Sequence, residues 1–311
     1  MAIKFFVILS KNPVTDTYAR LFFCLQILMI IIFILISVRF YTLLERKLLR
    51  LSQLRLGPNK QRFYGILQPI LDGLKLFKKT ERKNHKIYFY FFSLRSIFIL
   101  RISFIFWRGY PFKVWINKTS RFFWILILIG LMRFFILILG WRSFNKYSLL
   151  GSLRRISQII SLEVLTVIIM VVYLILLNKR CLSLREGLFW GSSIFLIFIY
   201  FVAFLIEVQR TPFDTAEGER ELVRGYNTEF RALFFVFIFL SEYINILFFS
   251  GFIAILIRKS WILWAISMQA MLLTRACFPR VRYDFLIEYA WLKILPLTIC
   301  LAFIISSIKF L

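Results

Sequence analysis

The feature that most constrains this chain is a series of apolar stretches, each about as long as a membrane is thick. An α-helix needs about 20 apolar residues to cross the roughly 30 Å hydrocarbon core of a bilayer. About eight stretches approach that length, at residues 21–43, 87–107, 122–140, 156–177, 188–206, 232–257, 261–273 and 289–308. They predict an all-α membrane protein, a polytopic bundle of about eight transmembrane helices that forms a single domain over residues 1–311. The second and third stretches are interrupted by Arg95, Arg101 and Arg133.

The charge of the chain has to be explained together with its apolar character. The net charge is +26, yet 60% of the residues are hydrophobic. A soluble basic protein would suggest a nucleic-acid partner, but an average soluble domain is only about 45–50% apolar. Loops 44–86, 141–155, 207–231 and 275–293 contain 24 Lys and Arg residues, and residues 1–20, 107–121, 178–187 and 258–259 of the opposite side contain 12. The excess predicts that the first set lies on the matrix or cytoplasmic side, beside anionic lipid, and that both termini lie opposite. We expect no nucleic-acid partner.

The cysteine and histidine content argues against a metal centre. No two of the four Cys residues have the spacing of a metal site, and the only His is His85. The spacing therefore predicts no zinc or iron–sulfur site in this chain.

The acidic residues are few and unevenly placed. Six of the fifteen fall within 23 positions, namely Glu207, Asp214, Glu217, Glu219, Glu221 and Glu229. Two more, Glu163 and Glu242, lie inside apolar stretches, where an ionisable group costs roughly 2.5–3.5 kcal/mol on insertion scales. Arg210 follows Glu207 at i+3, which is a helical spacing. A solvated loop is the usual explanation of a charge run, but the buried acids favour a relay of carboxylates that binds and releases protons.

An amphipathic segment follows the first apolar stretch. Residues 57–59 (GPN) indicate a turn, after which Leu67, Ile70, Leu71, Leu74 and Phe77 recur at helical spacing. Asp72 and Lys75 recur on the other face. The pattern predicts a helix that lies in the membrane interface. Two roles stay open, since the helix could anchor the chain to anionic headgroups or shape an entrance for a lipid-soluble substrate.

Longer motifs carry a resemblance to a known family. They are residues 44–47 (LERK), 53–59 (QLRLGPN), 64–69 (YGILQP), 72–77 (DGLKLF), 151–154 (GSLR), 161–164 (SLEV), 207–214 (EVQRTPFD), 216–219 (AEGE), 242–243 (EY), 282–284 (RYD) and 295–297 (LPL). In this order they resemble chain 1 of NADH:ubiquinone oxidoreductase. The family commonly has Thr-Asn where this chain has Val208-Gln209.

The resemblance implies a membrane subunit of respiratory complex I, an H+-translocating NADH:ubiquinone reductase. Such a subunit joins the membrane arm to the hydrophilic arm, lines the ubiquinone tunnel and begins the buried charged path that couples quinone reduction to proton translocation. It binds no flavin, iron–sulfur cluster or NAD itself. Its partners are the hydrophilic quinone-module chains, the membrane-arm chains and the lipid bilayer. Its location is the mitochondrial inner membrane, or the plasma membrane of a bacterium.

The resemblance also implies roles for particular residues. Glu45, Arg46, Asp72 and Lys75 flank the tunnel mouth. The acidic loop that faces the quinone cavity contains Glu207, Arg210, Phe213, Asp214, Glu217 and Glu219. Glu163 and Glu242 continue the relay into the bundle. Arg275, Arg282 and Asp284 lie on the matrix side, and Arg210 and Arg275 are expected to balance the carboxylates.

Two other functions remain open at this point. The chain could be an architectural anchor, in which the carboxylates only hold partner subunits. It could also be the related membrane subunit of an energy-converting hydrogenase. The glycine–proline turn together with the amphipathic segment favours the quinone enzyme.

Overall fold

The computed structural model describes residues 13–59, 65–79, 86–108, 118–141, 145–177, 186–214, 225, 230, 232–257 and 260–310, and these residues contain helices and turns but no strand. The helices are α2 (Pro13–Ser52), α4 (Gln68–Lys78), α5 (Lys86–Arg108), α6 (Lys118–Trp141), α7 (Lys146–Leu177), α8 (Glu186–Val208), α10 (Ala232–Ile257), α11 (Trp261–Cys277), α12 (Tyr283–Tyr289), η3 (Ala290–Ile294) and α13 (Leu295–Phe310). The all-helical prediction is confirmed for this part of the chain.

Each predicted apolar stretch is helical, the last one across α12, η3 and α13, and among the described residues four helical ranges are long and apolar enough to cross a membrane. These are Cys24–Ser52, Phe123–Trp141, Leu233–Ile255 and Tyr283–Ile304. Ile197–Val208 and Trp261–Cys277 form shorter apolar helices. A polytopic membrane architecture follows from these ranges, and the total of about eight spans stays a prediction.

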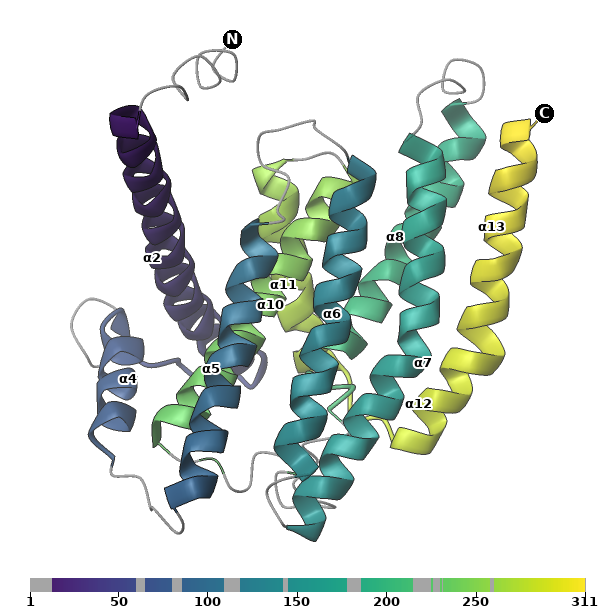
Figure 1. Ribbon diagram of the computed structural model, residues 1–311. Helices are drawn as coiled ribbons and strands as arrows, with labels where there is room; N and C mark the ends of the chain where they lie inside the picture. Colours follow the sequence, from purple (N-terminus) through teal and green to yellow (C-terminus); the bar gives the residue numbers. More distant parts are fainter. Residues whose placement is uncertain are drawn as a thin grey trace.

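The helices stand side by side and alternate in direction (Figure 1). The start of α2 and the end of α13 lie at the upper end of the view, whereas the end of α2 and the starts of α5, α7 and α12 lie at the lower end. The described parts of the loops predicted for the matrix side therefore gather at one end of the bundle. That this end faces the matrix stays a prediction.

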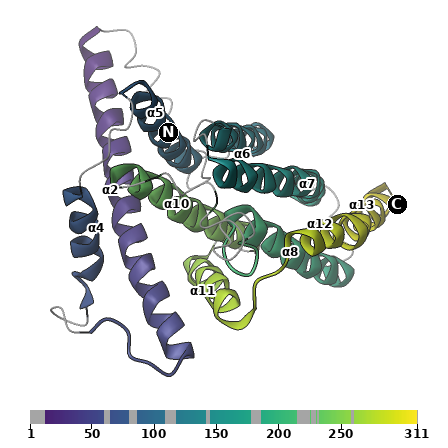
Figure 2. The same ribbon diagram turned by 90° about the horizontal axis from the view of Figure 1, so that it is seen from below.

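Helix α10 occupies the centre of the bundle. It packs against α2, α4, α5, α8 and α11, and in the view from below it crosses the middle of the molecule (Figure 2). Its aromatic residues pack closely with those of its neighbours: Phe204 of α8 stacks on Phe249 at 4.5 Å between ring centroids, and Phe106 of α5 lies 5.2 Å from Phe248. A helix that is apolar on every side belongs in such a buried position.

The predicted amphipathic helix is confirmed as α4. Proline in its first turn needs no backbone N–H donor there. Before it, Gly65 has φ +79°, and a Cβ at this position would overlap the carbonyl oxygen of Pro58, so only glycine fits the turn. The helix packs against α2 and α10, and it leaves Leu71, Leu74 and Phe77 exposed. Its place in the membrane interface stays a prediction.

The last apolar stretch contains a π-helical turn that the hydropathy pattern does not reveal. Residues Ala290–Ile294 form η3 between α12 and α13, and Pro296 lies two residues after its end. Proline removes one backbone donor and crowds the preceding turn, and local widening is a common way for membrane helices to accommodate it. The turn lets α12 and α13 continue as one helical rod past the proline (Figure 1).

Helices α6 and α7 meet closely at Gly140. A Cβ on Gly140 would overlap both Oγ and Cβ of Ser152, whereas a Cβ on Gly130 of the same helix would meet nothing within 4 Å. We expect Gly140→Ala to lower the stability of the assembled protein by about 1–3 kcal/mol, the usual effect of overpacking. Gly130→Ala should be neutral or slightly stabilising, because alanine favours a helix. Thermal inactivation of the two variants tests this, and equal inactivation temperatures would contradict the close contact.

Candidate functional site

Glu45 lies near the end of α2, where it is enclosed by α10 and α11. Its residue exposure is 5%. Arg275 of α11 forms an ion pair with its carboxylate, and the hydroxyl of Tyr243 on α10 donates a hydrogen bond to the same group. Tyr41 lies one helical turn before Glu45, so it shares that face of α2, and its ring lies 6.0 Å from the Tyr243 ring, edge to face. The buried carboxylate therefore has both a cation and a hydroxyl as partners.

The next residue, Arg46, links α2 to α4. Its Nη1 atom lies 2.5 Å from Oδ2 of Asp72, and the other oxygen of Asp72 accepts a hydrogen bond of 3.1 Å from Gln68. Both side chains of the ion pair are partly exposed, so the pair is worth at most about 1 kcal/mol. Lys75 lies one turn further along α4 and is exposed. Of the four residues predicted to flank the tunnel mouth, three have defined contacts at this corner of the bundle.

Arg210 connects the Glu45 group with the centre of the molecule. Its guanidinium lies 4.4 Å from the centroid of the Tyr243 ring, and its Nη2 atom lies 3.8 Å from Oε2 of Glu242. The other oxygen of Glu242 lies 3.6 Å from Nη1 of Arg155 on α7. Glu242 therefore lies between two guanidinium groups, although it is carried by an apolar helix. A buried carboxylate requires such partners, because burying it unpaired is very unfavourable.

The helical relation expected between Glu207 and Arg210 does not hold. Helix α8 ends at Val208, and Gln209 has φ +52°, in the left-handed region. This residue turns the backbone away from the helix axis, so Arg210 extends toward α10 instead of lying one turn above Glu207. Asparagine, the residue that the family commonly has here, adopts this conformation more readily than glutamine.

The rest of the described loop is held by contacts with α7 and with the segment after α11. The carbonyl oxygen of Phe213 accepts a hydrogen bond of 3.4 Å from Gln158, and the amide of Val281 donates to the carbonyl of Pro212 at 2.9 Å. Asp214 lies 3.6 Å from Arg280. The Phe213 ring packs against the hydrophobic core. Glu217 and Glu219, predicted for the same loop, lie outside the described residues.

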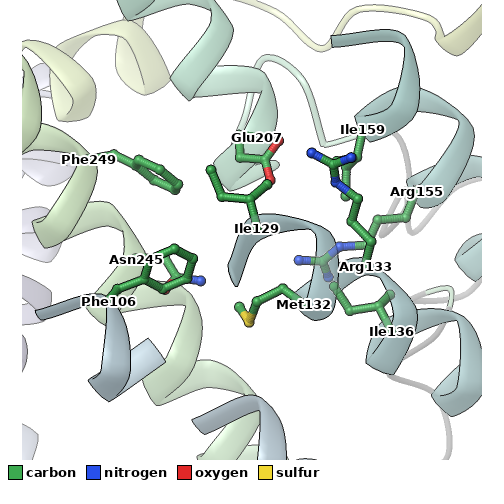
Figure 3. Close-up of a pocket in the computed structure, with 10 residues that line it drawn as sticks. All are labelled: Phe106, Ile129, Met132, Arg133, Ile136, Arg155, Ile159, Glu207, Asn245 and Phe249. Atoms are coloured by element: carbon green, nitrogen blue, oxygen red, sulfur yellow. The ribbon is translucent and has the colours of Figure 1, made fainter. Parts of the chain in front are cut away.

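A small cavity with both polar and apolar walls lies beside Glu207, between α5, α6, α7, α8 and α10. We call it the Glu207 cavity. Its volume of about 20 Å³ leaves room for a water molecule. It is lined by Phe106, Ile129, Met132, Arg133, Ile136, Arg155, Ile159, Glu207, Asn245 and Phe249. Figure 3 shows the carboxylate of Glu207 and the guanidinium groups of Arg133 and Arg155 around this space.

Glu163, the second predicted acid within a span, has an arginine partner from the neighbouring helix. Arg133 of α6 forms an ion pair with its carboxylate. The Arg133 side chain is only 8% exposed, whereas that of Glu163 is 38% exposed. Arg133 therefore joins Glu163 to the Glu207 cavity.

Several residues of this site were not predicted as site residues. They are Tyr41, Arg133, Arg155, Tyr243, Asn245 and Arg280. Arg133 could have been noticed in the sequence, because it interrupts an apolar stretch, but its partner lies 30 positions away in the chain.

The two cations that were predicted as charge partners, Arg275 and Arg210, do contact carboxylates, namely Glu45 and Glu242. Arg282 pairs with Asp284 at 3.1 Å on the surface. In the part of the chain that the structure describes, no group of three His, Cys, Asp or Glu residues could hold a metal ion.

Fold and site together define a polytopic helical membrane protein with an internal network of arginine–carboxylate contacts. The model of the family described as NADH dehydrogenase matches residues 25–306. A protein from Artemia franciscana named NADH-ubiquinone oxidoreductase chain 1 is 39% identical over 274 residues, which cover 86% of this chain and 92% of the relative. Proteins of the same name from Apis mellifera ligustica and Notamacropus eugenii are 36% and 37% identical, covering 88% and 91% of this chain and 93% and 96% of the relatives. The chain belongs to the NADH-ubiquinone oxidoreductase chain 1 family, and the resemblance seen in the sequence is confirmed.

Proposed function

We propose that this chain is a membrane subunit of a proton-pumping NADH:ubiquinone oxidoreductase, in which it encloses part of the ubiquinone path and transmits charge into the membrane arm. The family membership supports the enzyme, and the apolar helices support a multi-pass protein of the mitochondrial inner membrane. The related hydrogenase subunit is not favoured, since the relatives are named as chains of the NADH-ubiquinone enzyme. Other subunits of the same complex are the partners.

One observation carries the proposal, namely a series of charged and polar side chains across the bundle, in which Arg46 and Glu45 are neighbours in the chain and Arg155 and Arg133 line the same cavity. It starts at the corner of α2 and α4, where Asp72 meets Arg46, and continues through Glu45 to Tyr243 of α10. From there it passes over Arg210 to Glu242 and Arg155. It ends at Arg133 and Glu163, with Glu207 beside it in the Glu207 cavity. We call this series the charged path.

The residues at the outer end of the charged path suit an amphiphilic substrate. Ubiquinone has a polar headgroup and a long apolar tail. Arg46, Asp72 and Lys75 supply polar groups at the corner, and Leu74 and Phe77 of α4 present an exposed apolar surface beside them. Phe213 supplies an aromatic ring deeper in the bundle. In this proposal the headgroup passes the corner while the tail follows the apolar face of α4.

The chemistry of the charged path follows from its side chains. Reduction of ubiquinone to ubiquinol adds two electrons and two protons. The electrons come from partner chains, since in this proposal the chain binds no flavin, iron–sulfur cluster or NAD. Carboxylates and a tyrosine hydroxyl can exchange protons, whereas guanidinium groups stay charged. Proton uptake at the quinone therefore changes the charge next to Glu45, and the contacts of Tyr243, Arg210 and Glu242 pass that change inward.

Substitution of Glu207 by glutamine tests the proposal. Glutamine keeps the size and the hydrogen-bonding capacity of the side chain but cannot ionise. We expect the complex to assemble, while the NADH:ubiquinone rate and the protons moved per NADH both fall about tenfold or more, as for loss of an acid–base group. Glu163→Gln should act in the same direction. Glu288→Gln, at an exposed glutamate of α12, is the matched control and should change neither quantity.

The architectural alternative gives a different result in the same experiment. If the carboxylates only hold partner subunits, Glu207→Gln lowers the amount of complex, and the complex that remains keeps its normal rate and pumping. Reduction of a water-soluble acceptor upstream of the quinone measures the amount of complex independently. Normal pumping per assembled complex would refute the charge-transmitting role.

A further inference from the structure

Two arginines outside every matched motif line the Glu207 cavity. Arg133 comes from α6 and Arg155 from α7, and each side chain is only 8% exposed. Guanidinium groups do not lose their proton in proteins, so both bring permanent positive charge into the bundle. Charged groups at such depth are unfavourable without partners and indicate a function.

Each arginine is anchored to a different carboxylate and also faces Glu207. Arg133 pairs with Glu163, and Arg155 lies 3.6 Å from Glu242. Glu207 itself has no Lys or Arg nitrogen within 4.0 Å in the described ranges, and it lines the same cavity as these two guanidinium groups. The two arginines thus stand between a central carboxylate, which has no ion pair within the described residues, and two outer carboxylates that have one.

One hydrogen-bond donor of Arg133, its Nε–H group, has no acceptor among the described residues. Its Nη1 atom contacts Glu163. On the opposite side of the same cavity the Asn245 side-chain oxygen also has no hydrogen-bond partner among the residues that the structure describes. The cavity has room for a water molecule, which could join such groups to Glu207.

We propose that Arg133 and Arg155 are positioning residues for Glu207, which gather three carboxylates from three helices into one cluster with matched charge. This inference rests on the proposed function. The cluster contains three carboxylates, Glu163, Glu207 and Glu242, and three guanidinium groups, those of Arg133, Arg155 and Arg210. The fixed cations stabilise the ionised form of the carboxylates, so that Glu207 can release a proton after taking one up.

Methionine and lysine variants of both positions test this inference in the assembled complex. We expect Arg133→Met and Arg155→Met each to lower the kcat of ubiquinone reduction about fivefold, while the KM for ubiquinone changes less than about twofold. Arg133→Lys and Arg155→Lys keep the positive charge and should retain about half of the kcat or more. Arg101→Met is the matched control, since Arg101 also interrupts a predicted span but is exposed and lies beside Phe98 of its own helix.

The outcomes separate this inference from the proposed function. Normal kcat in both methionine variants, together with loss of activity in Glu207→Gln, would overturn the arginine role and leave the proposed function in place. Normal activity in Glu207→Gln would overturn both. A fall in kcat at unchanged KM that lysine restores supports the role.

If Arg133→Met does not assemble, a double variant tests the same role of Arg133. Removing both members of an ion pair that includes a buried side chain is less destabilising than removing one, so Arg133→Met/Glu163→Gln should assemble. Its kcat is compared with that of Glu163→Gln alone. A further fall of about threefold in the double variant supports a role of Arg133 toward Glu207, and equal rates would overturn it.

Discussion

Replacing Arg275 with methionine is expected to remove most of the assembled complex from the membrane. Glu45 is 5% exposed, and Arg275 is its cationic partner. Removing one member of a buried pair leaves an uncompensated charge and costs about 3–5 kcal/mol, a large part of the stability of a typical domain. The amount of complex resolved by native electrophoresis measures the effect.

A surface arginine on the following segment provides the control. Arg282 pairs with Asp284, but these side chains are 81% and 69% exposed, and such pairs contribute about 0–1 kcal/mol. Arg282→Met should therefore leave the amount of complex unchanged. The double variant Arg275→Met/Glu45→Gln should recover part of the complex, since no charge is then left unpaired. Full assembly of Arg275→Met alone would show that the ion pair contributes little.

Replacing Glu242 with glutamine is expected to have the second large effect. Its carboxylate lies between Arg155 and Arg210, at 3.6 and 3.8 Å. Glutamine removes the negative charge and leaves two guanidinium groups close together, so we expect both less complex and a rate per complex about tenfold to a hundredfold lower. Ubiquinone reduction, normalised to reduction of a water-soluble acceptor, separates these effects.

The same Glu288→Gln control applies to this prediction. A second comparison is Glu242→Asp, which keeps the charge on a shorter side chain and should retain more activity than the glutamine variant. If the aspartate and glutamine variants are equally inactive, keeping the charge at this position does not preserve the rate, which would contradict the prediction.

The positions of the long helices could be predicted because a stretch of about 20 apolar residues indicates a helix that crosses a membrane. Helix α10 occupies the predicted range of residues 232–257, since its residues are apolar throughout except for a short polar group around Glu242. Helix α7 begins at Lys146, ten residues before its apolar stretch at residue 156. Its first turns carry Lys, Ser and Arg side chains, and a hydropathy pattern does not distinguish a polar helix extension from a loop.

The candidate site could be predicted only in part. Acids such as Glu163 and Glu242 are visible in a sequence because a carboxylate inside an apolar stretch is unfavourable. Their partners are not visible, because Arg133 and Arg210 come from other helices and loops. The turn at Gln209 shows the same limit, since a single left-handed residue cancelled the helical spacing on which the pairing of Glu207 with Arg210 was based.

The contacts of α10 have a mechanical consequence. Glu242 and Tyr243 are consecutive residues on one helix, yet Glu242 faces Arg155 and Arg210 whereas the Tyr243 hydroxyl reaches Glu45. Successive side chains on an α-helix point about 100° apart, so a single peptide unit joins the outer and inner halves of the charged path. A small rotation of α10 about its own axis would change both sets of contacts at once. The helix therefore couples the contacts of Glu45 mechanically to those of Arg155 and Arg210.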